Sequence, residues 1–168
     1  PIILIMCGSA GSTAINDVVY KSLEYLTAKY FVVHISGKKG DFSVNNKDYV
    51  QIPFAKDIND LFSLADVVVC RAGANTLAEL VALRKKILAI PLPKGASRGD
   101  QVENALSYQK DGKLILLEQI NLNPQSLIEY INRVRFMQRT FINTIHHDVN
   151  ERIVKRIVEV IEINKAKK

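Results

Sequence analysis

The sequence lacks the features that mark secreted mini-proteins and membrane-spanning chains. Among its 168 residues there is no tryptophan, and there are only two cysteines, Cys7 and Cys70. Two cysteines cannot form a disulfide framework, so we expect both to be free, to pack as small apolar side chains and to lie in a reducing compartment. No apolar run approaches the roughly 20 residues that span a bilayer.

Motifs of several enzyme classes are also missing. No cysteines and histidines have the spacing of metal ligands, and no Asp-x-Asp sequence is present to hold a metal–diphosphate complex. No expected strand runs directly into a GxSxG elbow, the turn that marks a hydrolase nucleophile. The first glycine-rich segment, residues 7–12, is neither a GxGxxG dinucleotide motif nor a P-loop with its lysine.

The charge is unbalanced, with 23 Lys and Arg against 17 Asp and Glu and a formal net charge of +6. Part of the excess lies in the last helix and tail, and a basic end can favour nucleic acid or anionic lipid. Because no aromatic residues are interleaved with these cations as a base-stacking surface requires, we expect no nucleic acid partner.

Short apolar runs alternate with segments of helical periodicity. The expected strands are residues 2–7, 31–35, 49–52, 67–70, 87–90 and 114–117. The expected helices are residues 14–29, 57–65, 76–83, 101–110, 124–134 and 149–163. The strand runs are rich in Val, Ile and Leu and hardly alternate with polar residues, which is typical of strands buried on both faces. This order predicts a doubly wound α/β domain with a mainly parallel six-stranded sheet.

Ligands of such a sheet bind beyond the carboxyl ends of the strands, near the point where the strand order reverses. Residues 7–12 follow the first strand, and their glycines would let the backbone approach an anion at a helix start. A tight turn without a ligand fits the same residues equally well. After the fourth strand, Glu79 could accept hydrogen bonds from both hydroxyls of a ribose, or could be an ordinary exposed residue.

A third segment, residues 91–105, follows the fifth strand. Asp100, Gln101 and Asn104 gather at its helix start, with Gln101 and Asn104 on one face, and suit several sugar hydroxyls. Asp100 could at the same time be the N-cap of that helix. His34 ends the second strand near the same edge, and we expect a structural histidine with both ring nitrogens bonded rather than a base.

Together, the order and spacing of these segments resemble the C-terminal domain of the MurG family, the bacterial transferases that add N-acetylglucosamine (GlcNAc) to lipid I in peptidoglycan synthesis. The resemblance runs from Ile2 to about Ile128 and more loosely to the end of the chain. The matching stretches are residues 8–16, 34–38, 53–58, 71–79 and 91–105. That family has the two-domain GT-B fold, which implies a Rossmann-like C-terminal half.

The resemblance implies UDP-GlcNAc as the substrate and gives each motif a contact. The implied contacts are Gly8, Ser9 and Gly11 for the diphosphate; Phe54 and Ala55 for the uracil; Arg71, Gly73, Ala74, Asn75, Thr76 and Glu79 for the nucleotide and its ribose; and Asp100, Gln101 and Asn104 for the GlcNAc ring. Two residues depart from the family pattern. Cys7 stands where a glycine is usual and is expected to crowd the first loop, and Ser12 stands where an alanine is usual.

The implied reaction is an inverting transfer that needs no cofactor and no bound metal. The MurNAc C4 hydroxyl of undecaprenyl-pyrophosphoryl-MurNAc-pentapeptide (lipid I) attacks C1 of GlcNAc as UDP leaves, which forms lipid II. In this family an N-terminal domain carries acceptor binding, the membrane-facing surface and the expected general base, so we expect no catalytic residue in this chain. The full-length enzyme would be cytoplasmic, peripheral on the inner face of the cell membrane, and active in cell wall biogenesis, cell shape and cell division.

We expect residues 1–147 to form the UDP-sugar-binding domain, and residues 148–168 an amphipathic helix and basic tail. The apolar stripe of that helix fits either its own sheet or a partner, and the resemblance favours the missing N-terminal domain. The chain does not begin with Met, and we expect the donor-binding half of a larger enzyme, inactive alone. The alternative is a natural stand-alone donor-binding subunit that works only with a membrane-anchored partner chain. A UDP-GlcNAc 2-epimerase of related fold fits residues 71–79 and 96–105 poorly.

Overall fold

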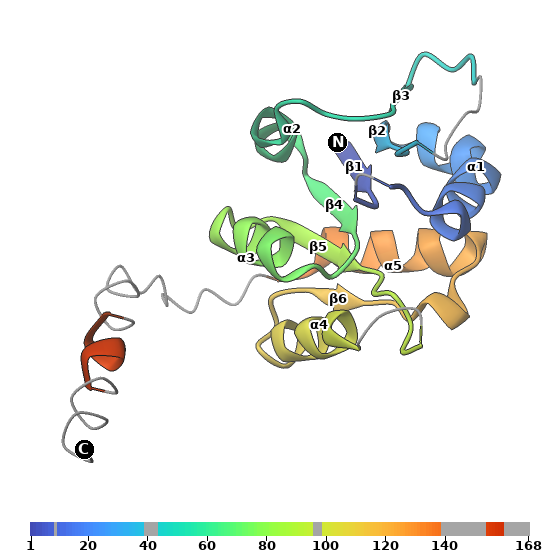
Figure 1. Cartoon of the computed structure of the whole chain (residues 1–168). Coiled ribbons are helices and arrows are strands. Elements are labelled where there is room, and N and C mark those ends of the chain that lie inside the picture. The colour runs from blue at the N-terminus through green and yellow to red at the C-terminus, as the bar shows by residue number, and fades with distance from the viewer. Residues whose placement is uncertain (9, 39–43, 96–98, 139–153, 160–168) are drawn as a thin grey trace.

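The computed structural model of the chain describes residues 1–8, 10–38, 44–95, 99–138 and 154–159. The described residues form one six-stranded sheet, and Figure 1 shows helices on both of its sides. The strands are β1 (Ile2–Met6), β2 (Phe31–Ile35), β3 (Tyr49–Ile52), β4 (Val67–Cys70), β5 (Lys86–Ala89) and β6 (Ile115–Leu116). The helices are α1 (Thr13–Thr27), α2 (Ile58–Leu64), α3 (Ala74–Ala82), α4 (Asp100–Lys110) and α5 (Pro124–Phe136), with a 3-10 turn η1 (Gln119–Asn121) before α5.

The sheet has the strand order β3-β2-β1-β4-β5-β6, and every pair of neighbouring strands is parallel. The predicted doubly wound, six-stranded parallel sheet is therefore confirmed. The chain order reverses between β1 and β4, which lie side by side at the centre. The loops after these two strands flank the switch point, where a sheet of this kind binds ligands.

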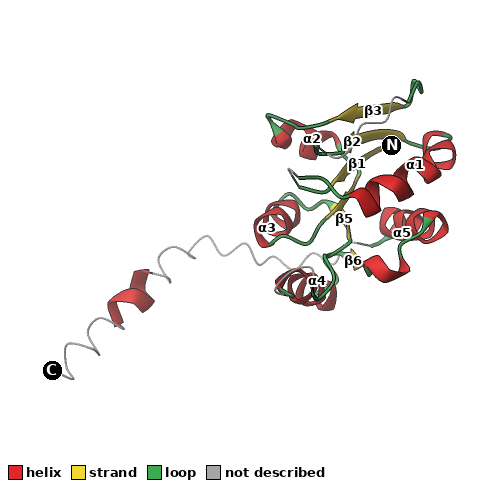
Figure 2. Ribbon diagram, turned by 45° about the vertical axis from the view of Figure 1, so that its right-hand side comes forward, coloured by secondary structure: helices red, strands yellow, loops and turns green. Residues whose placement is uncertain are grey.

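The two faces of the sheet carry different helices, as Figure 2 shows: α1 and α5 cover one side, and α2, α3 and α4 cover the other. Successive strand residues point to opposite faces. Ile3 and Ile5 of β1 therefore pack with α1 and α5, whereas Leu4 packs with the other three helices. Both faces of the central strands are buried, which explains why their sequences are almost continuously apolar.

Helix starts follow local sequence signals. Ser12 is the N-cap of α1, and its side chain accepts from the third residue of the helix. Asp57 caps α2 through its side chain, which accepts from the N–H of Asn59. Asn123 and Ser126 form a reciprocal capping box at the start of α5, ahead of which the chain turns back across the sheet.

Lysines cap the carboxyl ends of two helices, α2 and α5, at the amino edge of the sheet. Lys85 Nζ donates to the carbonyls of Ser63 at 2.9 Å and Ala65 at 3.1 Å, at the end of α2. Lys86 Nζ donates to the carbonyl of Arg135 at the end of α5. Cations are favoured at helix carboxyl ends, so the chain itself stabilises the ends of α2 and α5.

The expected helix over residues 149–163 is described only in part. Residues 154–159 are helical, and the rest of that prediction lies outside the described residues. Within the described residues, none of the helices combines the length and apolarity that a membrane span requires.

Candidate functional site

The loop between β1 and α1 forms a glycine-based turn at the switch point. Gly8 and Gly11 have φ angles of 78° and 73°, in the left-handed region that favours glycine. The Gly11 N–H donates to the Gly8 carbonyl at 3.1 Å, which closes the turn. Ser9, predicted to contact a diphosphate, lies outside the described residues. The first turn of α1 contains no acidic side chain, so nothing there repels an anion.

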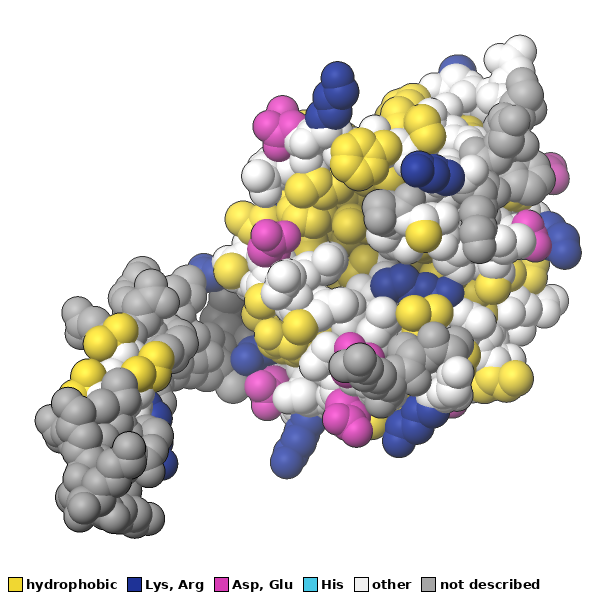
Figure 3. All heavy atoms as spheres, in the orientation of Figure 1, with side chains coloured by type: hydrophobic (Ala, Val, Ile, Leu, Met, Phe, Trp, Pro, Cys, Tyr) yellow, Lys and Arg dark blue, Asp and Glu magenta, His cyan; other side chains and the backbone are white. Residues whose placement is uncertain are grey.

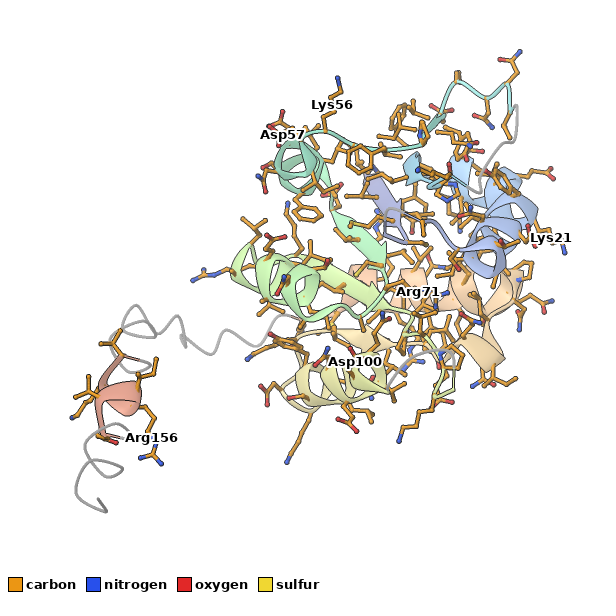
Figure 4. All side chains as sticks on the ribbon, viewed as in Figure 1. Lys21, Lys56, Asp57, Arg71, Asp100 and Arg156 are labelled. Carbon is orange, nitrogen blue, oxygen red and sulfur yellow. The ribbon has the colours of Figure 1, made fainter. Side chains whose placement is uncertain are left out.

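Arg71 follows β4 and ties three loops together. Its Nη2 donates to Ser12 Oγ at 2.7 Å, and its Nη1 donates to the carbonyls of Ile90 at 3.0 Å and Pro91 at 3.2 Å. The side chain therefore joins the loop after β4 to those after β1 and β5. Figure 4 shows Arg71 near the centre of this face of the domain.

The charge of Arg71 has no counter-ion in the described part of the chain. Its hydrogen bonds there go to two carbonyls and one hydroxyl, and none goes to a carboxylate. Partial burial lowers the pKa of Arg71 from its ordinary value, but a guanidinium stays protonated at neutral pH. The neighbouring Cys7 does not supply a negative charge, because burial raises the pKa of its thiol to about 12. The positive charge of Arg71 at the switch point is therefore not neutralised by these neighbours.

Helix α3 starts beside Arg71 without a side-chain cap. Its N-cap is Gly73, no side chain bonds the first-turn N–H groups, and that turn contains no acidic residue. A Cβ at Gly73 would meet only Thr76 Oγ1, at 4.0 Å, so the backbone is open to close approach. Glu79 lies exposed in the second turn of α3. The positions of Gly73 and Glu79 relative to the helix agree with the prediction, while their ligand contacts stay predictions.

Helix α4 starts one residue earlier than the sequence suggested. Its N-cap is Gly99, with φ of 86°, and Asp100 is the first helical residue, so the expectation that Asp100 caps the helix is wrong. The left-handed conformation at position 99 is one that glycine adopts readily and most residues do not. As the first helical residue, Asp100 is exposed and leaves its carboxylate available.

Two further polar residues of α4 bond the neighbouring loops. Gln101 Oε1 accepts from the N–H of Leu92 at 3.1 Å. Asn104 Nδ2 donates to the carbonyl of Ala72 at 3.3 Å. These bonds fix α4 against the loops after β5 and β4, so Asp100 and Glu79 are carried by elements that are joined to each other.

The loop after β3 presents an aromatic side chain. Phe54 is 64% exposed, and Ala55 is partly buried against the core. An exposed aromatic ring is a surface on which a flat base can stack. Figure 3 shows apolar side chains around a hollow on the face where Figure 4 labels Arg71 and Asp100.

The structure shows the surroundings of both cysteines and of His34. Both cysteines are free and buried, as expected. Cys7 belongs to the core cluster under α1, so the expectation that it crowds the loop is wrong: the side chain points into the core. His34 is the expected structural histidine, fully buried with both ring nitrogens bonded, and burial lowers its pKa to about 4.

Ser12 is the residue that sequence reasoning missed. It was noted only as a departure from the family pattern, yet its hydroxyl caps α1 and also accepts from Arg71. The cap could have been predicted, because Ser directly precedes the helical periodicity. The bond from Arg71, 59 residues away, has no local sequence signal.

Metal ligands are not grouped in the part of the chain that the structure describes: no three His, Cys, Asp or Glu side chains lie together there as a possible ion site.

The chain is similar to known proteins over nearly its whole length. The glycosyltransferase family 28 C-terminal domain matches residues 2–161. A Clostridium botulinum (strain Loch Maree / Type A3) protein is 38% identical over 165 residues, which are 96% of this chain and 47% of that protein. A Clostridium perfringens protein is 38% identical over 164 residues, with 96% and 46% covered. Both are named UDP-N-acetylglucosamine--N-acetylmuramyl-(pentapeptide) pyrophosphoryl-undecaprenol N-acetylglucosamine transferase.

A solved structure agrees with these relatives. The crystal structure of Acinetobacter baumannii MurG is similar with a TM-score of 0.67 and 27% identity, over 79% of this chain and 40% of that chain. The chain therefore spans about half the length of the curated relatives it matches.

Proposed function

Because this chain belongs to the family of glycosyltransferase family 28 C-terminal domains, we propose that it is the donor-binding half of a GlcNAc transferase and that its ligand is UDP-GlcNAc. The resemblance to the MurG family that the motifs predicted is confirmed by the relatives and by the solved structure. The donor, the acceptor and the role of each residue are our proposals.

The observation that carries the proposal is the uncompensated positive charge at the switch point. Arg71 has no carboxylate partner among the described residues, and the first turns of α1 and α3 contain no acidic side chain. A diphosphate supplies the missing negative charge, and helix N-termini favour it. We assign its contacts to the turn formed by Gly8, Ser9 and Gly11, with Arg71 behind that turn.

The uncharged parts of the donor suit the residues around this centre. The exposed carboxylate of Glu79 can accept from both ribose hydroxyls, and the first turn of α3 can line the nucleotide through Gly73, Ala74, Asn75 and Thr76. Phe54 and the Ala55 backbone are assigned to the uracil. Acidic residues do occur in the first turn of α4, namely Asp100 and Glu103. A carboxylate there would accept the hydroxyls of a neutral sugar, with Gln101 and Asn104 in support.

In the proposed reaction this chain orients the donor and stabilises the leaving group. The MurNAc C4 hydroxyl of lipid I attacks C1 of GlcNAc, the bond from C1 to the diphosphate oxygen breaks, and UDP leaves with the negative charge. Arg71 and the backbone N–H groups of α1 and α3 would stabilise that charge as it develops. The base that takes the hydroxyl proton belongs, in this proposal, to the other half of the enzyme, which also binds the acceptor at the inner face of the cytoplasmic membrane.

The helix near the carboxyl end fits a docking role in the full-length enzyme. Val154, Ile157 and Val158 are 59%, 54% and 47% exposed on the helical residues 154–159. We propose that residues 1–147 form the UDP-sugar-binding domain and that residues 148–168 pack across the N-terminal domain. Detectable transfer of GlcNAc to a lipid I analogue by this chain alone would overturn the division of labour between the two halves.

Calorimetric titration tests the donor site. The chain should bind UDP-GlcNAc more tightly than UDP-glucose, and ADP-glucose least. Glu79→Ala should weaken UDP-GlcNAc binding about tenfold, because the ribose loses bonds to a charged group. Glu24→Ala, which removes another exposed helical carboxylate, is the matched control and should change nothing. Equal affinity for the three nucleotide sugars, or none for any of them, would contradict the proposal.

A further inference from the structure

A group of polar side chains is buried beneath the β1–α1 loop, on the side of the sheet that α1 covers. Asn16, His34 and Ser36 are fully buried, and Tyr49 is 6% exposed. The rest of the core around them is apolar. Polar groups lose solvation free energy on burial unless their hydrogen bonds are made inside the protein, so such a network is retained only where its bonds are satisfied.

The bonds of this network end on the backbone of Ser36. Tyr49 Oη donates to His34 Nδ1 at 2.9 Å, and His34 Nε2 donates to Asn16 Oδ1 at 3.0 Å. Asn16 Nδ2 then donates to the carbonyl of Ser36 at 3.0 Å. Gln51 Nε2 donates to Ser36 Oγ at 3.1 Å. Since the Asn16 amide nitrogen is used on the carbonyl, its oxygen faces the imidazole, which therefore carries its proton on Nε2.

Ser36 and Gly37 in turn press against the β1–α1 loop. A Cβ at Gly11 would lie 2.2 Å from the Ser36 carbonyl oxygen, and a Cβ at Gly37 would lie 2.3 Å from the Gly11 nitrogen. The two backbones therefore touch without any side chain between them. A shift of the Ser36 carbonyl must move Gly11, because atoms at this packing density have no free space to absorb it.

We propose that Asn16, His34 and Tyr49 are positioning residues for the diphosphate-binding loop: they hold the Ser36 carbonyl, and Ser36 with Gly37 sets the place of Gly11. The inference rests on the proposed function, since it assigns the loop to a diphosphate. None of the three side chains needs to touch the ligand, because all are buried below the turn.

The test separates loop geometry from general stability. Tyr49→Phe removes the hydroxyl that bonds His34 and also lies 3.3 Å from Gln51 Oε1, the side chain that bonds Ser36 Oγ. Asn16→Leu removes the bond to the Ser36 carbonyl at nearly constant volume. The matched control is Tyr30→Phe, which removes another buried hydroxyl, bonded to Asn132 Oδ1 at 2.9 Å. For each variant, the dissociation constants of UDP and of uridine are measured by NMR titration, and stability by urea unfolding.

We expect Tyr49→Phe and Asn16→Leu to weaken UDP binding about three- to tenfold, which is the effect of one or two lost hydrogen bonds. Uridine binding should change little. Tyr30→Phe should lower stability with the UDP-to-uridine ratio unchanged. An unchanged ratio in Tyr49→Phe would overturn this inference and leave the proposed function standing, even if Asn16→Leu fails to fold. Failure of the unsubstituted chain to bind UDP would overturn both.

Discussion

The two edges of the sheet treat the ends of their helices in opposite ways. At the amino edge, Lys85 and Lys86 donate to the last carbonyls of α2 and α5, so the negative helix ends meet cations of the same chain. At the carboxyl edge, α1 and α3 begin without an acidic residue in the first turn, and the cation next to them is Arg71. The ends of α2 and α5 are thus balanced by cations of the chain, whereas the starts of α1 and α3 lie beside a cation.

The difference indicates which edge is built for a ligand. Helix N-termini in proteins favour Asp or Glu in the first turn, and α2 and α4 of this chain follow that preference with Asp60, Asp100 and Glu103. The two helices at the switch point do not. A guanidinium that joins three loops and bonds no described carboxylate leaves its charge available to an anion, which is the physical basis of the diphosphate assignment.

Removal of the Arg71 charge should reduce UDP affinity more than any other change proposed here. Arg71→Met should weaken UDP binding about 10- to 100-fold, because a half-buried charged partner of the diphosphate is lost. Arg71→Lys keeps the charge but loses the forked bonds to three loops. Its UDP affinity should lie between that of the unsubstituted chain and that of Arg71→Met. The measurement is calorimetry with UDP. UDP affinity that Arg71→Met leaves unchanged would show that the positive centre is not for the diphosphate.

Acid should lower the stability of the fold through His34, which lies in the buried polar network beneath the β1–α1 loop. The pKa of His34 is lowered from 6.5 to about 4 by burial. Between these values the unfolded state binds a proton that the folded state does not, so stability is retained above pH 6.5 and lost as pH falls toward 4. From pH 7.5 to pH 5 this group should contribute a loss of about 2 kcal/mol in the free energy of unfolding.

Urea unfolding of the unsubstituted chain and of His34→Gln at both pH values measures that contribution. The loss on going to pH 5 should be smaller in the variant by about the stated amount. Equal losses in the two proteins would show that His34 is not held neutral by the fold.

At the amino edge, a lost cation should affect stability alone. Lys85→Met removes two bonds to the end of α2 and should lower the free energy of unfolding by about 1 kcal/mol, while UDP affinity stays unchanged. Thermal unfolding and calorimetry on one preparation measure both quantities. A change in UDP affinity as large as that of Arg71→Met would erase the distinction between the edges.

An acidic residue placed at the switch point should have the smallest effect, and should change stability and UDP affinity in opposite directions. Ala14 is exposed in the first turn of α1. Ala14→Glu should stabilise the fold by about 0.5 kcal/mol through the helix dipole, yet weaken UDP binding about two- to threefold through repulsion. Ala14→Gln is the uncharged control and should do neither. Changes of the same sign in stability and affinity would contradict the account.

The fold could be predicted from the sequence because its signals are local. The apolar runs gave β2, β3 and β4 with the bounds that the structure has. The signal is clearest for β4, which is buried on both faces and consists of three valines and a cysteine. The expected strand over 114–117 shortens to Ile115–Leu116, although its flanking leucines stay buried. The family was predicted from the resemblance of the loop motifs, because periodicity alone indicates a fold and not a family.

The parts of the site that the sequence did not predict depend on contacts between distant segments. Asp100 has the stronger local preference for an N-cap, but the left-handed backbone at Gly99 takes that place. The bond from Arg71 to Ser12 and the contact between Gly11 and Gly37 join loops that meet only once the sheet has formed. No pattern within one helix or strand contains that information.

The most direct measurement of the central claim is a map of UDP-GlcNAc binding on the backbone amides, followed by NMR. We expect shifts at Gly8, Gly11, Gly73 and Glu79, all at the carboxyl edge, and none at Lys85 or Lys86 on the amino edge. Shifts confined to the amino edge, or spread evenly over both, would contradict it.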